Sequence, residues 1–472
     1  MAKLPNVLVS LALGFLDVSE VCARCRAVCK LWLTVPVRWS TLSLLNENEV
    51  KEAGATCEPL FVRSVILWSQ LTLLPCVDAW PRVGTVRTLY PTVTDDCLCV
   101  VASLPELQEL DLMTTRHVTD VGLERLSRLS QLKALRLVNR YEHQNFSDEG
   151  VHRLLSHLTG LEKLEFATAV TAKGLRALAS LPNLRHLELH SSALQNDVFF
   201  ILAQCDGLQR LSLARCALLS DFACLSSLRG LLDLTLKATE LRDTGLAAVC
   251  ALPLQSLDIS DCFEVTDNGF KHIGLCVSLR KLIINGCLVT DNGFRHLRAL
   301  HVLTRLGAQE CELLTDQALD CVTLLPLQEL EISDLQPLVC LPSLRKLRWR
   351  TPDNASFTPL CTWVRLEKLE VDGCVLDLWM LPLSLLKLRL SDTDIDDEAL
   401  RHLARLAGLR TLTLRTLYGC RKFTGSGLRY LRPLRFLHTI CVHSDNEMRV
   451  CPPVAMPALT SLRWNHREML ES

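Results

Sequence analysis

The chain has 472 residues, of which 49% are hydrophobic, and its formal net charge at pH 7 is −1. A chain so close to neutrality has no overall charge to attract nucleic acid or an anionic membrane surface. It also has no run of roughly 20 apolar residues that could span a bilayer. We therefore expect a folded protein with neither nucleic acid nor membrane as its partner.

The 22 cysteines are spread along the whole chain, many of them at apolar positions. Disulfide frameworks are typical of small secreted domains, whereas a free cysteine behaves as a small buried hydrophobe. The sequence therefore predicts reduced thiols in a cytoplasmic or nuclear protein.

Residues 1–45 contain two predicted short helices with broad apolar faces. Pro5 stands where the first helix would begin, and Asp17-Val18-Ser19 separates it from the second. The apolar positions at helical spacing are Leu8, Leu11, Phe15 and Leu16, then Val21, Cys25, Val28 and Trp32. Helices this short cannot bury such faces internally, so a partner or the first repeats must cover them.

The apolar run VLVSLALGFL, which follows Lys3, has a second interpretation as the hydrophobic region of a secretory signal. Pro5 precedes this run, and Asp17 and Glu20 follow it closely. These residues favour the amphipathic helix, and a secreted or surface protein is kept as an alternative.

Three groups of residues in this segment match a known pattern. They are Leu4-Pro5 at the start, Leu16-Asp17 closing the first helix, and Val28-Cys29-Lys30-Leu31-Trp32 in a later helix. With these residues the segment resembles an F-box, the helical module that docks on the Skp1 adaptor of cullin-RING ubiquitin ligases. The resemblance implies that Leu4, Pro5, Leu16, Val28 and Trp32 contact the adaptor or support that contact. Residues 39–44 resemble the junction between an F-box and the strand of a first repeat.

Residues 46–106 are predicted to be a linker with weak first repeats, near Val62-x-x-Val65-x-Leu67 and around Val86 to Leu89. From 107 to 472 the pattern Leu-x-x-Leu-x-Leu recurs in sixteen copies, most of them 22 to 25 residues apart. The copies open at Leu107, Leu132, Leu161, Leu184, Leu208, Leu231, Leu254, Leu279, Leu303, Leu327, Leu344, Leu366, Leu385, Leu409, Leu437 and Leu459. A fixed period in this range indicates an α/β leucine-rich-repeat solenoid.

One central copy, Leu254 to Ser278, illustrates the predicted unit. A short strand with Leu257 directed inward is followed by a turn at Asp261-Cys262. Thr266 is a good helix N-cap. We expect the helix that follows to direct Phe270, Ile273 and Leu275 inward.

Two markers recur in these units: a helix start of the form Thr-Asp-x-Gly, as at Thr266 and Thr290, and a cysteine after the strand. The cysteines are Cys216, Cys262, Cys287, Cys311 and Cys374. Both markers resemble the cysteine-containing subfamily of leucine-rich repeats, which implies a horseshoe with a concave parallel sheet and convex helices. Spacings of 17, 22 and 19 residues between Leu327 and Leu385 predict copies that lose the helix.

We find no motif for catalysis and expect no cofactor and no metal. Cys22-x-x-Cys25-x-x-x-Cys29 lacks a second cysteine or histidine pair at the spacing of a zinc site, and its thiols share one helical face. Histidines such as His186 and His190 are expected to be structural. The chain is therefore expected to be a non-catalytic binding protein.

Strand alternation places the residues between the leucines on the face of the sheet away from the core. In the early strands these residues are mainly acidic, among them Glu109, Asp111, Glu165 and Glu188. In the later strands they form a predicted basic patch of Lys346, Arg348, Arg350, Lys387, Arg389 and Arg415. The patch could be only a solvated polar face, or it could bind an acidic or phosphorylated segment, because arginine pairs with phosphate through two hydrogen bonds.

An F-box followed by such repeats resembles the leucine-rich-repeat class of F-box proteins along essentially the whole chain. The resemblance implies the substrate-recognition subunit of an SCF ubiquitin ligase, with a Skp1-like adaptor, a cullin and a protein substrate as partners. The alternative is a leucine-rich-repeat scaffold without a role in ubiquitination.

Overall fold

The computed structural model describes residues 41–44, 64–67, 82–88, 93–113, 115–139, 145–335, 341–350, 363–373, 378–391, 395–416, 426–444, 458–464 and 467–468. The chain divides into two compact units, Met1–Glu240 (unit 1) and Leu241–Ser472 (unit 2). Each unit is an array of strands joined by helices or turns, as a solenoid requires.

The strands of unit 1 form one parallel ladder in chain order. They are β1 (Thr41–Leu44), β2 (Ser64–Leu67), β3 (Thr85–Thr88), β4 (Glu109–Met113), β5 (Ala134–Val138), β6 (Lys163–Ala167), β7 (His186–Leu189), β8 (Arg210–Ser212) and β9 (Asp233–Thr235).

Unit 2 repeats this arrangement, with strands β10 to β19 parallel and in chain order and the short β20 antiparallel to β19. The strands are β10 (Ser256–Asp258), β11 (Lys281–Ile283), β12 (Arg305–Ala308), β13 (Glu329–Ser333), β14 (Lys346–Arg350), β15 (Lys368–Asp372), β16 (Lys387–Ser391), β17 (Thr411–Thr416), β18 (Thr439–Ser444), β19 (Ser461–Trp464) and β20 (Arg467–Glu468).

Every one of the sixteen predicted copies forms a strand that begins two residues after its first leucine. In the copy at Leu344, for example, Leu344, Leu347 and Trp349 are all buried. The three apolar positions of the motif therefore build the core, and the predicted α/β leucine-rich-repeat solenoid is confirmed.

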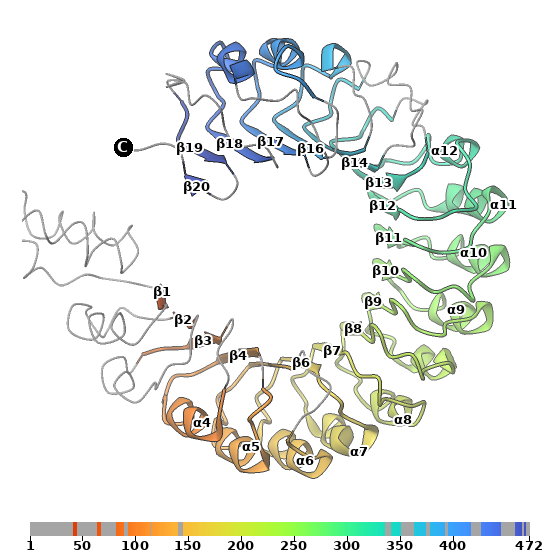
Figure 1. Ribbon diagram of the computed structural model, residues 1–472. Helices are drawn as coiled ribbons and strands as arrows, with labels where there is room; N and C mark the ends of the chain where they lie inside the picture. Colours follow the sequence, from red (N-terminus) through yellow and green to blue (C-terminus); the bar gives the residue numbers. More distant parts are fainter. Residues whose placement is uncertain are drawn as a thin grey trace, which may run out of the picture. The chain divides into compact units, whose positions relative to one another are not determined.

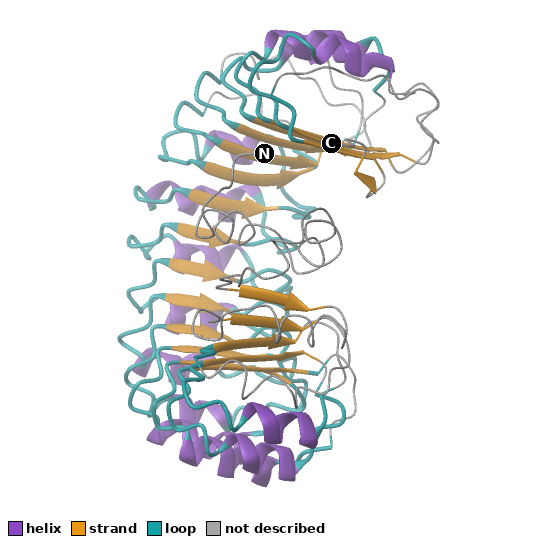
Figure 2. Cartoon of the chain, turned by 90° about the vertical axis from the view of Figure 1, so that its left-hand side faces the viewer, coloured by secondary structure: helices purple, strands orange, loops and turns teal. Residues whose placement is uncertain are grey.

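Within each unit the helices lie on one side of the strand ladder (Figures 1 and 2). Unit 1 has α4 (Asp95–Val101), α5 (Asp120–Leu126), α6 (Asp148–His157), α7 (Ala172–Leu175), α8 (Val198–Leu202) and the 3₁₀ helices η4 (Arg176–Ser180) and η5 (Phe222–Ser227). Unit 2 has α9 (Asp243–Val249), α10 (Asp267–Ile273), α11 (Asp291–Phe294), α12 (Gln317–Asp320) and the 3₁₀ helices η6 (Arg295–Ala299), η8 (Leu378–Met380), η9 (Ala399–Arg405) and η10 (Ser426–Leu431).

The Thr-Asp-x-Gly motif connects each repeat to the next by hydrogen bonds. Thr290 caps α11 by accepting a hydrogen bond from the backbone N–H of Asn292, as predicted for an N-cap. Asp267 of the preceding repeat accepts from both the N–H and the hydroxyl of Thr290, at 2.8 and 2.6 Å. A Cβ on Gly293 would overlap this same carboxylate and stand 2.8 Å from Val289. The glycine is therefore required by the aspartate of the neighbouring repeat.

The same contact recurs in both units. In each case an aspartate accepts two hydrogen bonds from the helix cap of the next repeat, and the pairs are Asp95–Thr119, Asp120–Ser147, Asp148–Thr171, Asp243–Thr266, Asp267–Thr290 and Asp291–Thr315. This chain of caps stabilises the helical side in both units.

The turn after the strand also behaves as expected, with one correction. Cys262 is fully buried below the turn, and Asp261 has a left-handed backbone with φ of 59°. Phe270 and Ile273 of α10 are buried. The expectation for Leu275 is wrong: it is 74% exposed, because α10 ends at Ile273 and the chain turns before Leu275.

The repeats between β13 and β16 are shorter, as their spacing predicts. Among the described residues of this stretch, η8 is the only helical segment. Trp349 lies in the core here, and its indole N–H donates to the carbonyl of Leu335 at 2.8 Å. The strands stay in register through this region, so the ladder continues although the helical side changes.

Candidate functional site

The solvent-facing side of each sheet, opposite the helices, is called the open face here. In β14, Leu347 and Trp349 are buried whereas Arg348 and Arg350 are exposed. Since neighbouring strands are paired in register, open-face residues form columns that run across the strands. The charge on one strand therefore faces the charges on the strands to either side.

The open face of unit 1 neutralises its own charges. Arg136 on β5 lies between Asp111 and Glu165, with nitrogen–oxygen distances of 3.2 and 2.7 Å. Burial alone would lower the pKa of Arg136, but the hydrogen bond to Glu165 and the charges of both acids outweigh it and raise the pKa. Glu165 is only 8% exposed. Arg136 therefore stabilises a carboxylate that water can hardly reach.

In a second column of unit 1, Lys163–His186–Arg210–Asp233, the lysine and the arginine are also ion-paired. Lys163 pairs with Glu188 at 3.7 Å, and Arg210 pairs with Asp233 at 3.4 Å. His186 lies between Lys163 and Arg210 in the ladder. Partial burial and these two cations lower the pKa of His186, so its imidazole is neutral at pH 7.

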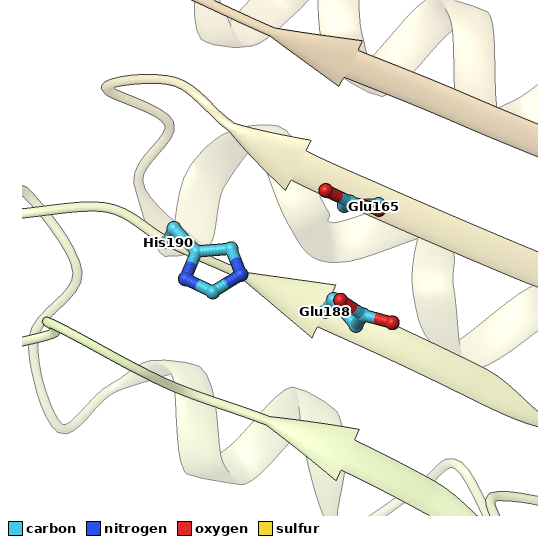
Figure 3. A group of neighbouring side chains, drawn as sticks. All are labelled: Glu165, Glu188 and His190. Carbon is cyan, nitrogen blue, oxygen red and sulfur yellow. The ribbon is translucent and has the colours of Figure 1, made fainter. Parts of the chain in front are cut away.

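Figure 3 shows Glu165 and Glu188 on the neighbouring strands β6 and β7, with His190 just beyond the end of β7. One donor atom from each lies within 4.8 Å of the others, which is close enough for a shared cation. His190 Nδ1 lies 3.2 Å from the carbonyl oxygen of Ala214, and since a carbonyl only accepts, Nδ1 is the donor in this hydrogen bond.

Both carboxylates of this group already have cationic partners, because Glu165 pairs with Arg136 and Glu188 with Lys163. A metal ion would have to displace a guanidinium and an ammonium group from them. The group therefore belongs to the ion-pair ladder of unit 1 and gives no support for a metal centre. The sequence did hold a signal for it, because Glu165 and Glu188 stand at the same position of successive repeats.

The open face of unit 2 has three columns across β13 to β17. From one edge to the other they are Glu329–Lys346–Lys368–Lys387–Thr411, Glu331–Arg348–Glu370–Arg389–Thr413 and Ser333–Arg350–Asp372–Ser391–Arg415. Acidic residues stand on β13 and β15, and the open-face residues of β16 and β17 in these columns are basic or uncharged. The two ends of the predicted basic patch therefore have different surroundings.

The basic residues on β14 are all ion-paired. The nitrogen–oxygen distances are 3.4 and 3.8 Å from Lys346 to Glu329 and Glu331, 3.9 and 3.8 Å from Arg348 to Glu331 and Glu370, and 2.9 and 3.7 Å from Arg350 to Glu310 and Asp372. Burial alone would raise the pKa of Glu370, but the hydrogen bond from Lys368 and the charges of Lys368, Arg348 and Lys346 outweigh it and lower the pKa. Glu370 therefore stays ionised, and the ion pairs with it and the other acids hold the β14 bases in place.

Lys387, Arg389 and Arg415 differ from the β14 bases. Within the part of the chain that the structure describes, none of the three makes an ion pair, and all are exposed. The column positions give the reason. Arg389 lies between Thr413 and Glu370, and Glu370 is already held by Lys368 at 2.6 Å.

The open-face arginines of β14, β16 and β17 converge on one recess of about 350 Å³. Arg348, Arg350, Arg389 and Arg415 line it together with Glu310, Glu370 and Asp372, above the buried Trp349 and Val371. Four cations thus face three acids, a formal excess of one positive charge, and among the described residues Arg389 and Arg415 are the two lining arginines without an ion pair.

The structure brings four of the six predicted patch residues into this recess and leaves Lys346 and Lys387 outside its lining. Their role in binding stays a prediction. Sequence reasoning missed Glu310 and Glu331, which neutralise part of the patch. The predicted adaptor residues Leu4, Pro5, Leu16, Val28 and Trp32 lie outside the described residues, as does Cys374.

The described cysteines are free thiols, and those that lie buried in the core are Cys205, Cys216, Cys262, Cys276, Cys287, Cys311 and Cys321. The thiol of Cys287 donates to the carbonyl of Ile259 at 3.2 Å, and that of Cys311 to the carbonyl of Ile284 at 3.2 Å. Burial raises the pKa of Cys287 and of Cys311. These thiols are therefore protonated structural groups and poor nucleophiles.

Among the described residues, none of the helices has the length and apolar character that crossing a bilayer requires.

No protein-family model matches the chain, and no curated protein matches it. Solved structures do resemble it. The TLR13–ssRNA13 complex is 19% identical over 92% of this chain and 72% of its own, with a TM-score of 0.48. The yeast Rad7–Elc1 complex is 14% identical over 92% and 91%, with a TM-score of 0.46. The leucine-rich-repeat protein LIC12759 of Leptospira interrogans is 14% identical over 84% and 92%, with a TM-score of 0.39. The assignment of the fold rests on the repeat geometry of the chain itself.

Proposed function

We propose that this chain is the substrate-binding subunit of an SCF-type ubiquitin ligase. In this proposal residues 1–45 dock on a Skp1-like adaptor bound to a cullin. The open faces of the repeats hold a protein that is ubiquitinated and then degraded. Chemistry is supplied by other subunits, and this chain contributes proximity, which converts a bimolecular step into an effectively unimolecular one.

The observation that carries the proposal is the F-box-like sequence from Leu4 to Trp32, which is followed almost at once by the repeat ladder. The first strand, β1, begins at Thr41 and pairs in parallel with β2. So short a connection between a docking segment and a binding array is what a substrate receptor needs, because the held protein must stay at a fixed distance from the ligase. The apolar helical faces predicted in residues 1–45 also need a partner to cover them.

The repeat fold supports the binding half of the proposal. Leucine-rich-repeat sheets present a long, side-chain-lined surface, and this surface carries a charged recess in unit 2. We place the protein in the cytoplasm or nucleus, where its many free cysteines would stay reduced.

The test is a pull-down of the full chain with purified Skp1 and with cell extract. We expect Skp1 and a cullin to co-purify, and Leu4→Ala/Pro5→Ala to reduce the recovered Skp1 about tenfold or more, since apolar anchors dominate such interfaces. The neighbouring pair Lys3→Ala/Asn6→Ala, which lies outside the matched pattern, is the control. If Skp1 binds neither the parent chain nor the control, the chain is instead a repeat scaffold without a role in ubiquitination.

A further inference from the structure

The recess in unit 2 contains two arginines that form no ion pair within the described residues. Arg348 and Arg350 each pair with two acids, which fixes their side chains. Arg389 and Arg415 line the same recess and make no ion pair with any described residue. Two guanidinium groups thus line one recess, and no described side chain occupies their hydrogen-bond donors.

The neighbours of these arginines explain why the charge persists. Arg415 has Ser391 beside it on β16, and Arg389 has Thr413 beside it on β17. The adjacent acids Glu370 and Asp372 are engaged by Lys368 and Arg350 at 2.6 and 3.7 Å. An acid at either neutral position would neutralise the recess, as Asp111 and Glu165 neutralise Arg136 in unit 1.

We infer that this recess binds the phosphoryl group of a phosphorylated protein segment. A phosphoryl group on serine or threonine carries a charge of about −1.5 to −2 and three acceptor oxygens. It therefore matches two guanidinium forks, whereas a single carboxylate, with one charge and two oxygens, satisfies only one. Arginine suits this role better than lysine because its planar donors fit the phosphate oxygens in pairs.

The remainder of the ligand is a polypeptide. The recess opens on the strand face and is lined from β14, β15, β16 and β17, so a segment that carries the phosphoryl group can lie across these strands. The inference rests on the proposed function only for the source of that segment, a protein held for ubiquitination. The recess itself and its charge do not depend on the adaptor.

The test measures binding of fluorescent degenerate peptides with a central phosphoserine or phosphothreonine to the full chain by anisotropy. We expect binding that the unphosphorylated peptides lack. We expect Arg389→Gln and Arg415→Gln each to weaken it about tenfold or more, because each removes a charge-assisted hydrogen-bonded pair. Arg410→Gln is the matched control, since Arg410 is an exposed arginine just before β17 that does not line the recess and is not part of the predicted patch. Its affinity should stay within about twofold of the parent.

Equal affinity for phosphorylated and unphosphorylated peptides overturns the inference, and so does unchanged affinity in the Arg389→Gln/Arg415→Gln double variant. Competition with inorganic phosphate and with inositol hexakisphosphate tests whether the phosphoryl group belongs to a protein segment or to a free polyphosphate. If inositol hexakisphosphate binds and the peptides do not, the ligand is a free polyphosphate and the assignment of a peptide ligand is wrong. A chain that binds Skp1 but no phosphopeptide refutes only this inference. A chain that binds phosphopeptides but not Skp1 refutes only the proposed function as a ubiquitin-ligase subunit.

Discussion

Arg136 in unit 1 and Arg389 in unit 2 occupy the same position of the repeat, between its second and third apolar residues. Arg136 has an acid on each neighbouring strand, Asp111 and Glu165, and is paired with both. Arg389 has Thr413 on one side and, on the other, a Glu370 that is held by Lys368. The repeat thus fixes where an arginine points, while the adjacent strands decide whether its charge stabilises the fold or stays open to a ligand.

The same substitution at these two positions is the strongest way to separate them. We expect Arg136→Gln to lower the free energy of unfolding by about 2–3 kcal/mol, because it leaves the nearly buried Glu165 without its cation. Arg389→Gln should change it by less than about 0.5 kcal/mol, as expected for an exposed side chain that makes no ion pair with a described residue. Urea denaturation followed by circular dichroism measures both values. Equal losses at the two positions would remove the distinction between paired and available arginines.

The helical side of the repeats should not distinguish the two units. We expect Gly150→Ala in unit 1 and Gly293→Ala in unit 2 each to cost about 1–3 kcal/mol. In both cases the new Cβ would overlap the aspartate of the preceding repeat, Asp120 or Asp267.

Gly230→Ala is the control for this pair, because its Cβ would meet carbonyl oxygens only at 3.5 Å, an ordinary contact. Urea denaturation should show a change below about 0.5 kcal/mol for this variant. A loss in one unit alone would mean that the chain of caps matters in that unit only.

The fold could be predicted because its determinants are local. The leucine spacing determines where each strand lies, and the Thr-Asp motif determines where a helix begins. Leu275 was misplaced because nothing in its local pattern indicates that α10 ends at Ile273.

The candidate site could be predicted only in part, for a different reason. Strand alternation identifies Arg348 and Arg389 as open-face residues, but whether each is neutralised depends on residues 17 to 24 positions away, such as Glu331 and Thr413. Aligning the repeats by their leucines would have shown these columns. The recess also depends on side-chain lengths and ion pairs, which spacing does not specify.

Converting the open face of unit 2 into one like that of unit 1 is a more specific test. Thr413→Glu places an acid beside Arg389, and we expect it to weaken phosphopeptide binding about tenfold by occupying the guanidinium. Thr411→Glu is the matched control, because position 411 lies beside Lys387, outside the recess. Anisotropy titrations at constant ionic strength compare the two variants. The comparison fails if Thr411→Glu weakens binding as much as Thr413→Glu, since general charge would then explain both.

The smallest effect is expected in the cores, where the two units should behave alike. Burial, with a contribution from Asp206, raises the pKa of Cys205 in unit 1 from 9.0 to about 11. Burial also raises the pKa of Cys311 in unit 2 to about 11, although backbone hydrogen bonds from Cys287 and Gly286 oppose it. Because the folded-state pKa is the higher one, the unfolded chain loses the proton first. The stabilisation is therefore fully present below pH 9 and is lost as the pH rises through about 11.

We expect the free energy of unfolding to fall by about 1 kcal/mol per thiol near the middle of this window, measured by urea denaturation under reducing conditions. Cys205→Ala and Cys311→Ala should each make this decline shallower, whereas Cys99→Ala, at an exposed position, should leave it as in the parent. An unchanged decline in both core variants would assign the pH dependence to other groups. A change in only one of them would mean that the cores, like the open faces, differ between the two units.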